Sequence, residues 1–515
     1  MRNEEKESAV RAIGTPIRPR HGGAYFGALV GLLACVSLPA GFALASPVRS
    51  AAQPDRLEPG LQGQTMPGDV PGSILAIPYS KGVEVIGHDT IRGRDSNVQL
   101  SWVDHCAYVS STAGPFPLLS TTKGDPNLTG VAVIDVRDPA HPKTVKLLRD
   151  QGSIAALETM HAVDAPGRKV LAAGAYGNGE GGAQPNDKPA WLDIYDVSDC
   201  ANPKLTAEVK WPQNAHTVRV SPNGRRVYGT VISPFTGKGG LEIMDISDMA
   251  HPRFVGKFEA TRVDGTTFSF ATHEISFSPD ERRIYAGVIA STGGDLNVGK
   301  PILPPSRDEL GPDGGGIYIL DNSDIVDGKP DPKLRLIGTI PHGGWHSVMP
   351  ARIKGVPYLV GGSELTACPG TWPKISNIAD ETKPFVVGEF RLAMNQKKNC
   401  PPMSPMEKAT GGIVPAPGSA TLHFNDVDSA TDTRLGLFNF LWAGLRIADL
   451  RNPAAPVEVA YFKPGDACGG HVRYMPQTGQ IWLSCGQSGF YVLALKPALR
   501  VARGLPPVAR VARRR

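Results

Sequence analysis

Residues 131–138 read Val-Ala-Val-Ile-Asp-Val-Arg-Asp, a short aliphatic run followed by a turn rich in aspartate. Five further segments have the same pattern, and they begin at Trp191, Leu241, Ile317, Ile375 and Leu445. In five of the six copies a proline stands seven residues after the first Asp or Asn of the turn; these are Pro142, Pro203, Pro252, Pro384 and Pro456. Alternating aliphatic residues predict a strand, and Asp or Ser side chains that bond their own backbone predict the turn that ends it.

Each repeat contains more than this one strand. A second short β run follows the turn, and a strand–turn–strand unit precedes the aspartate pattern. The preceding units at residues 216–228 and 273–285 are near duplicates, each running from a histidine to a tyrosine. Four short antiparallel strands per repeat are typical of a propeller blade, so the sequence predicts an all-β protein built as a single β-propeller.

The spacing of the repeats predicts the number of blades. Asp135 and Asp449 are 314 residues apart over five intervals, so a repeat averages about 63 residues. A seventh strand at residues 489–493 lacks the turn, and an N-terminal strand near residues 83–86 is expected to complete its blade and close the ring. Seven four-stranded blades fit best, with six or eight as alternatives. Closure leaves no open sheet edge that could pair with another chain.

Composition and charge divide the chain into four parts. With 59 Gly and 47 Pro in 515 residues, the chain is unsuited to a helical bundle. Residues 1–45 have a cationic start, an apolar run and an Ala-Leu-Ala end, which predicts a secretory signal peptide, with an uncleaved membrane anchor as the alternative. Residues 46–79 are expected to be a linker, residues 80–495 the propeller and residues 496–515 a basic tail. The sequence thus predicts a periplasmic or secreted protein with no membrane span after signal cleavage.

Charge and cysteine content agree with that location. Positive charges concentrate near the two ends of the chain and the body is mildly acidic, so no nucleic-acid partner is expected. Six cysteines follow the signal, an even number that suits disulfides in an oxidising compartment. We expect Cys368 to pair with Cys400 and Cys468 with Cys485, and buried free thiols are the alternative. The sequence has no Cys-x-x-Cys motif, which argues against a redox dithiol or a zinc knuckle.

The strand Val131-Ala-Val-Ile-Asp135 resembles the motif that gives the LVIVD-repeat β-propeller family its name. The resemblance covers about residues 80–495 and implies a secreted or periplasmic propeller. The strand that begins at His273 is also distantly similar to one in the selenium-binding protein and methanethiol oxidase family. That second resemblance implies seven blades and, in some members, a copper-dependent oxidase. The cysteine-rich selenium motif of that family has no counterpart in this sequence, so its substrate is not carried over.

Six histidines are predicted to share one position in their blades: His161, His216, His273, His346, His423 and His471. Three of them stand twelve residues before a tyrosine, and the same count from Tyr108 places Ser96 at this position in the first blade. The first strand of each blade lines the central channel of a propeller, so equivalent side chains are expected to form a ring around it.

Converging imidazoles predict a metal site. Protonated together they would repel one another, whereas neutral imidazoles can share a transition metal. Copper suits such a site best, with zinc, iron or calcium left open. Glu274 adjoins His273, but on an alternating strand it would point away from the channel. The alternative is that each histidine bonds the backbone of the next blade and has a structural role only.

Three functions are compatible with this sequence. The first is a copper-dependent oxidoreductase that acts on a small substrate, with a histidine that moves protons. The second is a metal-dependent hydrolase or lactonase, in which the ion lowers the pKa of a bound water. The third is a non-catalytic propeller that binds a protein or a cell surface. The sequence identifies neither the substrate nor the catalytic residues.

Overall fold

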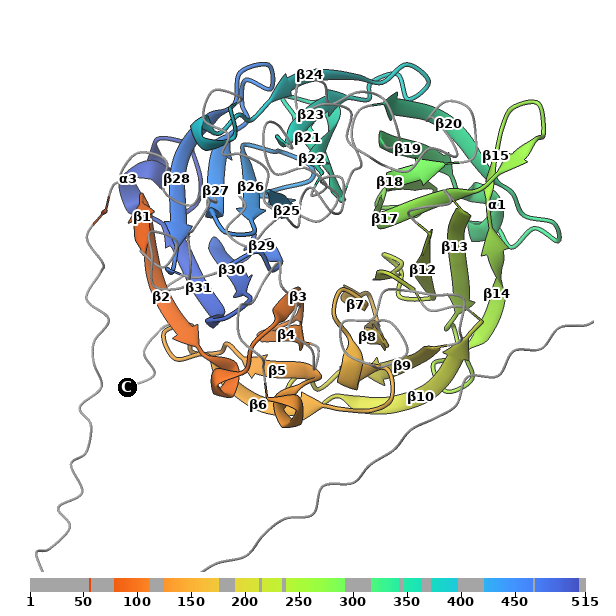
Figure 1. Cartoon of the computed structure of the whole chain (residues 1–515), viewed down its shortest axis with the longest axis horizontal. Helices are drawn as coiled ribbons and strands as arrows, with labels where there is room; N and C mark the ends of the chain where they lie inside the picture. The colour runs from red at the N-terminus through yellow and green to blue at the C-terminus, as the bar shows by residue number, and fades with distance from the viewer. Residues whose placement is uncertain are drawn as a thin grey trace, which may run out of the picture. The chain divides into compact units, whose positions relative to one another are not determined.

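The computed structural model describes residues 55–56, 78–111, 125–175, 190–212, 215–233, 238–291, 316–341, 346–363, 372–396, 421–465 and 468–508. Seven antiparallel sheets follow one another around a central axis, which confirms the seven-bladed propeller (Figure 1). The predicted signal peptide, most of the linker, the end of the basic tail and the cysteines Cys368 and Cys400 lie outside the described residues.

Within each blade the first strand is innermost and the last is outermost. Blade 1 contains β3 (Asn97–Val103), β4 (Cys106–Ser111), β5 (Val131–Asp135) and β6 (Lys143–Leu148). Blade 2 contains β7 (Met160–Ala165), β8 (Arg168–Gly174), β9 (Ala190–Asp196) and β10 (Lys204–Trp211). Blade 3 contains β11 (Val218–Val220), β12 (Arg226–Ser233), β13 (Lys238–Asp245) and β14 (Arg253–Phe258).

Blade 4 contains β17 (Phe270–Phe277), β18 (Arg283–Ser291), β19 (Gly316–Asp321) and β20 (Leu334–Pro341), extended by β15 (Ala260–Thr261) and β16 (Thr267–Phe268). Blade 5 contains β21 (Ser347–Ile353), β22 (Val356–Gly362), β23 (Lys374–Asn377) and β24 (Phe385–Glu389). Blade 6 contains β25 (Leu422–Val427), β26 (Leu435–Phe440), β27 (Gly444–Asp449) and β28 (Val457–Lys463), with β1 (Tyr79–Lys81) as a fifth strand.

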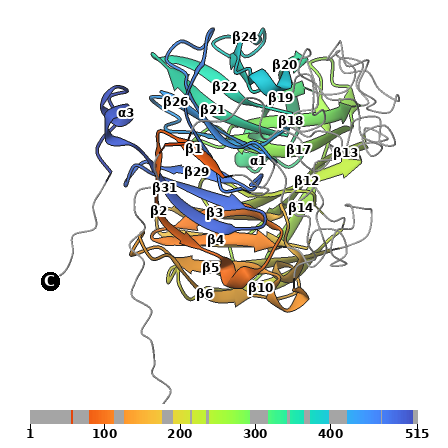
Figure 2. The ribbon, with the colours of Figure 1, turned by 60° about the vertical axis from the view of Figure 1, so that its left-hand side comes forward.

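The N-terminal strand closes the ring, as the sequence predicts. Blade 7 contains β29 (Val472–Met475), β30 (Gln480–Cys485) and β31 (Gly489–Leu495), and its outer strand is β2 (Val83–Asp89). Figure 2 shows β2 beside β31. One blade is thus built from two segments that lie about 400 residues apart, so the ring closes only when the two ends of the fold come together.

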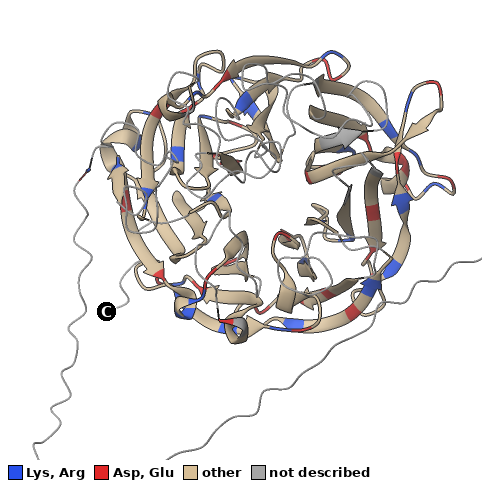
Figure 3. Ribbon diagram, viewed as in Figure 1, with Lys and Arg blue, Asp and Glu red and all other residues tan. Residues whose placement is uncertain are grey.

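Helical structure is limited to short segments in the described residues. They are α1 (Ser323–Val326) and α3 (Pro497–Val501), with 3-10 turns η2 (Ile91–Gly93), η3 (Pro126–Leu128), η4 (Ser153–Ala155) and η5 (Ala393–Asn395). In the part of the chain that the structure describes, neither α-helix has the length that a bilayer crossing needs. Figure 3 shows positive and negative residues interspersed along the outer strands.

The aspartate turns form as expected. In the third blade the Asp245 carboxylate accepts a hydrogen bond from the Ser247 backbone N–H at 2.9 Å, and Asp248 accepts one from Ala250 at 3.0 Å. These bonds satisfy backbone groups at the end of the strand and direct the chain back into β14. Adjacent blades then pack through aliphatic side chains, such as Val170 and Ile194 of blade 2 against Val218 and Val227 of blade 3.

Two disulfides are present among the described residues. Cys468 pairs with Cys485 within blade 7, and Cys106 pairs with Cys200, which joins blade 1 to the end of β9 in blade 2. The second bridge was not expected from the sequence, because its cysteines are 94 residues apart. Spacing along the chain favours local pairs, whereas a propeller brings corresponding positions of successive blades together.

A buried carboxylate gives the fold a dependence on pH. The Asp428 side chain accepts hydrogen bonds from the backbone N–H groups of Arg434 and Leu435, both at 2.9 Å. Burial nevertheless raises the pKa of Asp428 to about 6. The folded protein therefore holds this proton up to about pH 6, whereas the unfolded chain releases it near pH 4. The contribution of this group to stability is greatest below pH 4 and falls as the pH rises through 6.

Asp428→Asn is expected to remove the loss of stability that the wild type shows as the pH rises from 4 to 6. The amide oxygen of the variant can still accept the two backbone hydrogen bonds. Between pH 4 and pH 7.5 the unfolding free energy of the variant should gain about 2 kcal/mol on that of the wild type. Urea unfolding at both pH values measures the difference. Asp432→Asn, at an exposed position of the same loop, is the control and should show little change. An equal pH dependence in wild type and Asp428→Asn would contradict the assignment.

Candidate metal centre

The β-bulge that recurs between the two outer strands of each blade aligns the blades residue by residue. From this bulge we follow the paired residues inward, from the third strand to the second and then to the first. This alignment identifies one channel-facing position in each blade. We call this set the histidine level; it contains Val98, Glu158, His216, His273, His346, His423 and Gly470. Four successive blades thus carry a histidine there, and the blade before them carries a glutamate.

These five polar side chains meet in the channel. The Nε2 atoms of His216 and His273 are 2.7 Å apart. Glu158 places Oε2 3.3 Å from His216 Nε2 and 3.7 Å from His273 Nε2, and it places Oε1 3.2 Å from His423 Nε2. The ring of His346 lies between those of His273 and His423, with centroid distances of 3.8 Å and 4.5 Å, respectively.

The cluster is almost fully removed from solvent. None of the five residues is more than 6% exposed. Phe424 covers one side, with its ring centroid 4.2 Å from that of His423 and 4.7 Å from that of His346. Titratable groups are rarely buried together unless each has a compensating partner.

Electrostatics favour an ionised Glu158 and a neutral His346. Burial alone would raise the pKa of Glu158, but hydrogen bonds from His216 and His423, together with the nearby His273, hold that pKa well below its usual value. Burial lowers the pKa of His346 well below its usual value, and the adjacent His273 and His423 lower it further. The site therefore presents an ionised carboxylate and, at His346, a neutral imidazole, which are the protonation states that metal ligands need.

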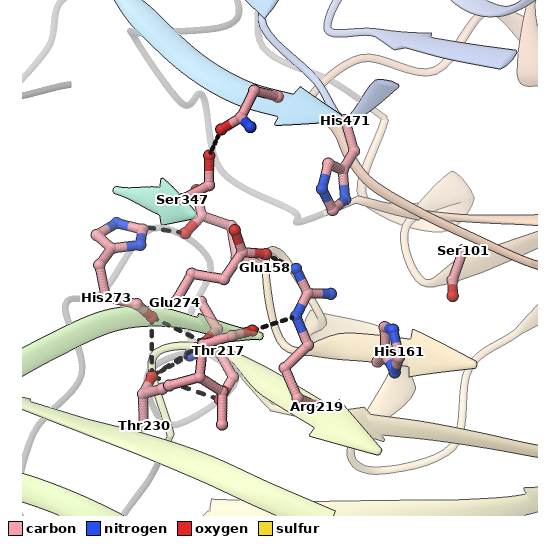
Figure 4. Close-up of polar contacts among 12 residues, drawn as sticks. Ser101, Glu158, His161, Thr217, Arg219, Thr230, His273, Glu274, Ser347 and His471 are labelled. Atoms are coloured by element: carbon pink, nitrogen blue, oxygen red, sulfur yellow. Dashed lines mark hydrogen bonds and ion pairs between the residues drawn. The ribbon is translucent and has the colours of Figure 1, made fainter. Parts of the chain in front are cut away.

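Neighbouring backbone and side-chain groups hold the histidine-bearing strands and the His423 ring in place. The His423 Nδ1–H donates to the Gly469 carbonyl, which leaves Nε2 as the nitrogen that faces Glu158. The His273 carbonyl accepts bonds from the hydroxyls of Thr217 and Thr230, at 2.8 Å and 3.1 Å. Ser347 bonds the Asn425 side chain across the next blade boundary (Figure 4). Threonine and serine hydroxyls join these blades, and His423 and His161 also bond the backbone of the next blade, as the structural alternative predicts.

Two of the six predicted histidines lie outside the cluster. In blade 2 the hairpin between β7 and β8 is two residues longer than its counterpart in blade 3, so Glu158 takes the place equivalent to His216 and His161 falls three residues later. In blade 7 the aligned residue is Gly470, and His471 is one residue beyond it. Figure 4 shows His161 and His471 on the far side of Arg219 from His273.

The prediction that Ser96, His161 and His471 share the position of His216 in their blades was therefore wrong. The hairpin between β3 and β4 is two residues shorter than its counterpart in blade 3, so Val98 and not Ser96 lies at the histidine level. Glu158 was missed because the twelve-residue count fails in its blade. The available signal was the pair Glu158-Thr159, which matches His216-Thr217. Glu274 points away from the cluster, as expected, and forms an ion pair with Arg219.

A second group of possible ligand atoms lies near the surface, at His105, Cys106 and Cys200. Its two sulfur atoms are joined in a disulfide and offer no thiolate, so we do not consider it a metal site.

Comparison with known proteins identifies the repeat. The family model of the LVIVD repeat matches residues 236–260, which include all of β13 and β14. The chain contains an LVIVD repeat. No curated protein sequence matches it. The similarity to the selenium-binding protein family stays a prediction.

Several solved structures are similar in fold at 12% sequence identity. The periplasmic gluconolactonase PpgL of Pseudomonas aeruginosa has a TM-score of 0.46, with 75% of this chain and 92% of that chain covered. Sqt1 of Chaetomium thermophilum has a TM-score of 0.47, with 80% and 97% covered. A functionally unknown protein from Desulfotomaculum acetoxidans DSM 771 has a TM-score of 0.42, with 73% and 87% covered. None of these similarities bears on the activity of this protein.

Proposed function

We propose that this protein is a copper-dependent oxidoreductase that acts on a small substrate in the central channel of the propeller. The observation that carries the proposal is the meeting of His216, His273, His346, His423 and Glu158. Within each of two triplets, Glu158 with His216 and His273 and Glu158 with His346 and His423, the ligand atoms lie within 4.8 Å of one another, although the five residues come from five different blades. So many buried imidazoles around one point are costly unless a shared ion binds their lone pairs.

The donor set supports a nitrogen-preferring transition metal. Imidazole suits copper, iron, nickel and zinc, and copper has the highest affinity among the divalent ions of this series. Calcium, by contrast, prefers sites made of oxygen atoms, which a cluster with one carboxylate does not provide. A bound copper ion would supply one-electron transfer between a reducing substrate and dioxygen.

The remaining chemistry belongs to the protein. The four imidazoles would hold the ion, and the bond from His423 Nδ1–H to Gly469 fixes the tautomer of that ring. Glu158 orients His216 and His423 and can accept a proton from a substrate bound beside it. Phe424 excludes water from one side, which strengthens every electrostatic interaction inside the cluster.

A metal-dependent hydrolase is the second candidate, and Glu158 is the observation that favours it. A buried carboxylate next to a metal-bound water can act as the base that activates this water. The two candidates differ in the metal that each one needs. Copper supports electron transfer, whereas zinc has no redox chemistry.

Metal analysis of the purified protein separates the candidates. We expect copper at about one equivalent after expression into the periplasm with copper, zinc and iron supplied. A Cu(II) signal in electron paramagnetic resonance should show hyperfine coupling to nitrogen, and small reducing substrates should cause oxygen uptake. Zinc without oxygen uptake would favour the hydrolase. A protein that binds no transition metal under these conditions would contradict both enzymes and leave the non-catalytic propeller.

The periplasmic or secreted location also remains part of the proposal. Its support is the sequence pattern of residues 1–45 and the even number of cysteines after it.

A further inference from the structure

A cavity of about 440 Å³ lies in the channel beside the cluster of four histidines and Glu158. Three residues after the histidine level, the inner strands carry a second set of aligned positions, which we call the arginine level. It contains Ser101, His161, Arg219, Ser276, Met349, Asp426 and Arg473. Every member except Ser101 lines the cavity.

Three donors at this level have unused hydrogen-bonding capacity. Arg219 and Arg473 are 5% and 4% exposed, and within the described residues the Nη1 atom of each is buried without a hydrogen-bond partner. The same holds for the Ser276 hydroxyl. Because a buried donor without a partner costs free energy, three such donors around one cavity indicate a ligand that accepts from all of them.

The charges at this level favour an anion. Arg219 already bonds the Ile275 carbonyl and pairs with Glu274, and Arg473 lies over the Trp102 ring at 5.9 Å. Burial lowers the pKa of both arginines, and the charge of Arg473 further lowers that of Arg219. Two guanidinium groups that repel each other in one cavity are stabilised by a shared anion.

The other titratable groups do not remove this preference. Two carboxylates line the cavity: Asp426 lies near both arginines and burial raises its pKa, whereas Asp164 is half exposed and lies 3.8 Å from the Lys169 ammonium. Burial lowers the pKa of His161 well below its usual value, and Arg219 and Arg473 lower it further, so its ring is neutral at pH 7. In Figure 4 the Arg219 guanidinium lies between Glu158 and His161, at the boundary of the cluster and the cavity.

The rest of the lining is apolar. Trp102, Phe277 and Met349 contribute carbon surface that inorganic phosphate would leave uncovered. We propose that this cavity binds a small organic carboxylate, with its carboxylate on Arg219, Arg473 and Ser276 and its apolar body against Trp102 and Met349. As a binding site it does not require the metal. As the substrate subsite of the oxidoreductase it rests on the proposed function.

Calorimetry with phenylacetate, its neutral analogue phenylacetamide and inorganic phosphate tests this site. The full-length protein is used as purified and again after chelator treatment. We expect saturable binding of phenylacetate in both states and at least tenfold weaker binding of the amide and of phosphate. Arg473→Gln should weaken phenylacetate binding by roughly tenfold or more, and Ser276→Ala by roughly threefold to tenfold.

Several results would overturn the proposal. They are absence of phenylacetate binding, equal binding of the amide, phosphate binding as tight as that of phenylacetate, and a Ser276→Ala variant with unchanged affinity. If Arg473→Gln does not fold, Ser276→Ala decides, because removing one hydroxyl leaves the strand intact. The two proposals can fail separately. If the purified protein contains no copper but still binds phenylacetate, the carboxylate site is supported and the proposed function is contradicted.

Discussion

His273→Ala is expected to weaken metal binding by more than about 100-fold, because it removes the imidazole nearest the centre of the cluster. His273 Nε2 lies 2.7 Å from His216 Nε2 and 3.7 Å from Glu158, and its ring packs against His346. A double variant that also carries His216→Ala should lose the metal completely. The measurement is the copper content of the purified variant, followed by competition with a chelator of known affinity.

His471→Ala is the matched control. His471 is equally buried, but it lies one residue beyond the histidine level and contacts Arg473. Its replacement should leave the copper content unchanged. Equal copper in His273→Ala and wild type would contradict the ligand assignment, and so would equal losses in both variants. If His273→Ala does not fold, His273→Gln preserves more of the side-chain volume and answers the same question.

Arg219→Met is expected to have the largest effect on stability. Arg219 and Glu274 form an ion pair between blades 3 and 4, and their side chains are 6% and 2% exposed. Removing one partner leaves the other charge buried and unpaired, which costs about 3–5 kcal/mol. Denaturant unfolding should show this loss, whereas Arg219→Met with Glu274→Met should recover most of it.

Arg283 and Glu381 provide a matched comparison at the surface. Their ion pair also joins neighbouring blades, at 2.7 Å, but the side chains are 31% and 26% exposed. Arg283→Met should cost no more than about 1 kcal/mol, because water screens such a pair. Similar losses in Arg219→Met and Arg283→Met would show that burial does not control the strength of these pairs.

The fold could be predicted because each blade carries its own signals. The aliphatic run and aspartate turn at residues 241–248 specify a strand and its end locally, without reference to distant contacts. Ring closure by β2 followed from a seventh strand that needed a partner. The Cys106–Cys200 bridge could not be predicted from spacing, because it depends on how corresponding turns of two blades meet.

The site was predicted in part, since its alignment depends on hairpin length. Counting twelve residues back from a tyrosine identifies His216 and His273, because their hairpins share one length; it also reaches His346, because the blade 5 hairpin is two residues longer and its tyrosine, Tyr358, lies two residues nearer the turn. Blade 2 has a hairpin two residues longer, which hid Glu158 and misplaced His161. The arginine level was not recognised, because its members differ in residue type and only the strand register shows that they are equivalent.

Anomalous scattering from crystals of the purified protein tests the central claim most directly. Data collected on both sides of the copper absorption edge locate any copper ion without assumptions about its ligands. We predict one strong peak in the channel, within bonding distance of nitrogen atoms from at least three of His216, His273, His346 and His423. Crystals of copper-loaded protein that show no peak there, or a peak only at the molecular surface, would contradict the assignment.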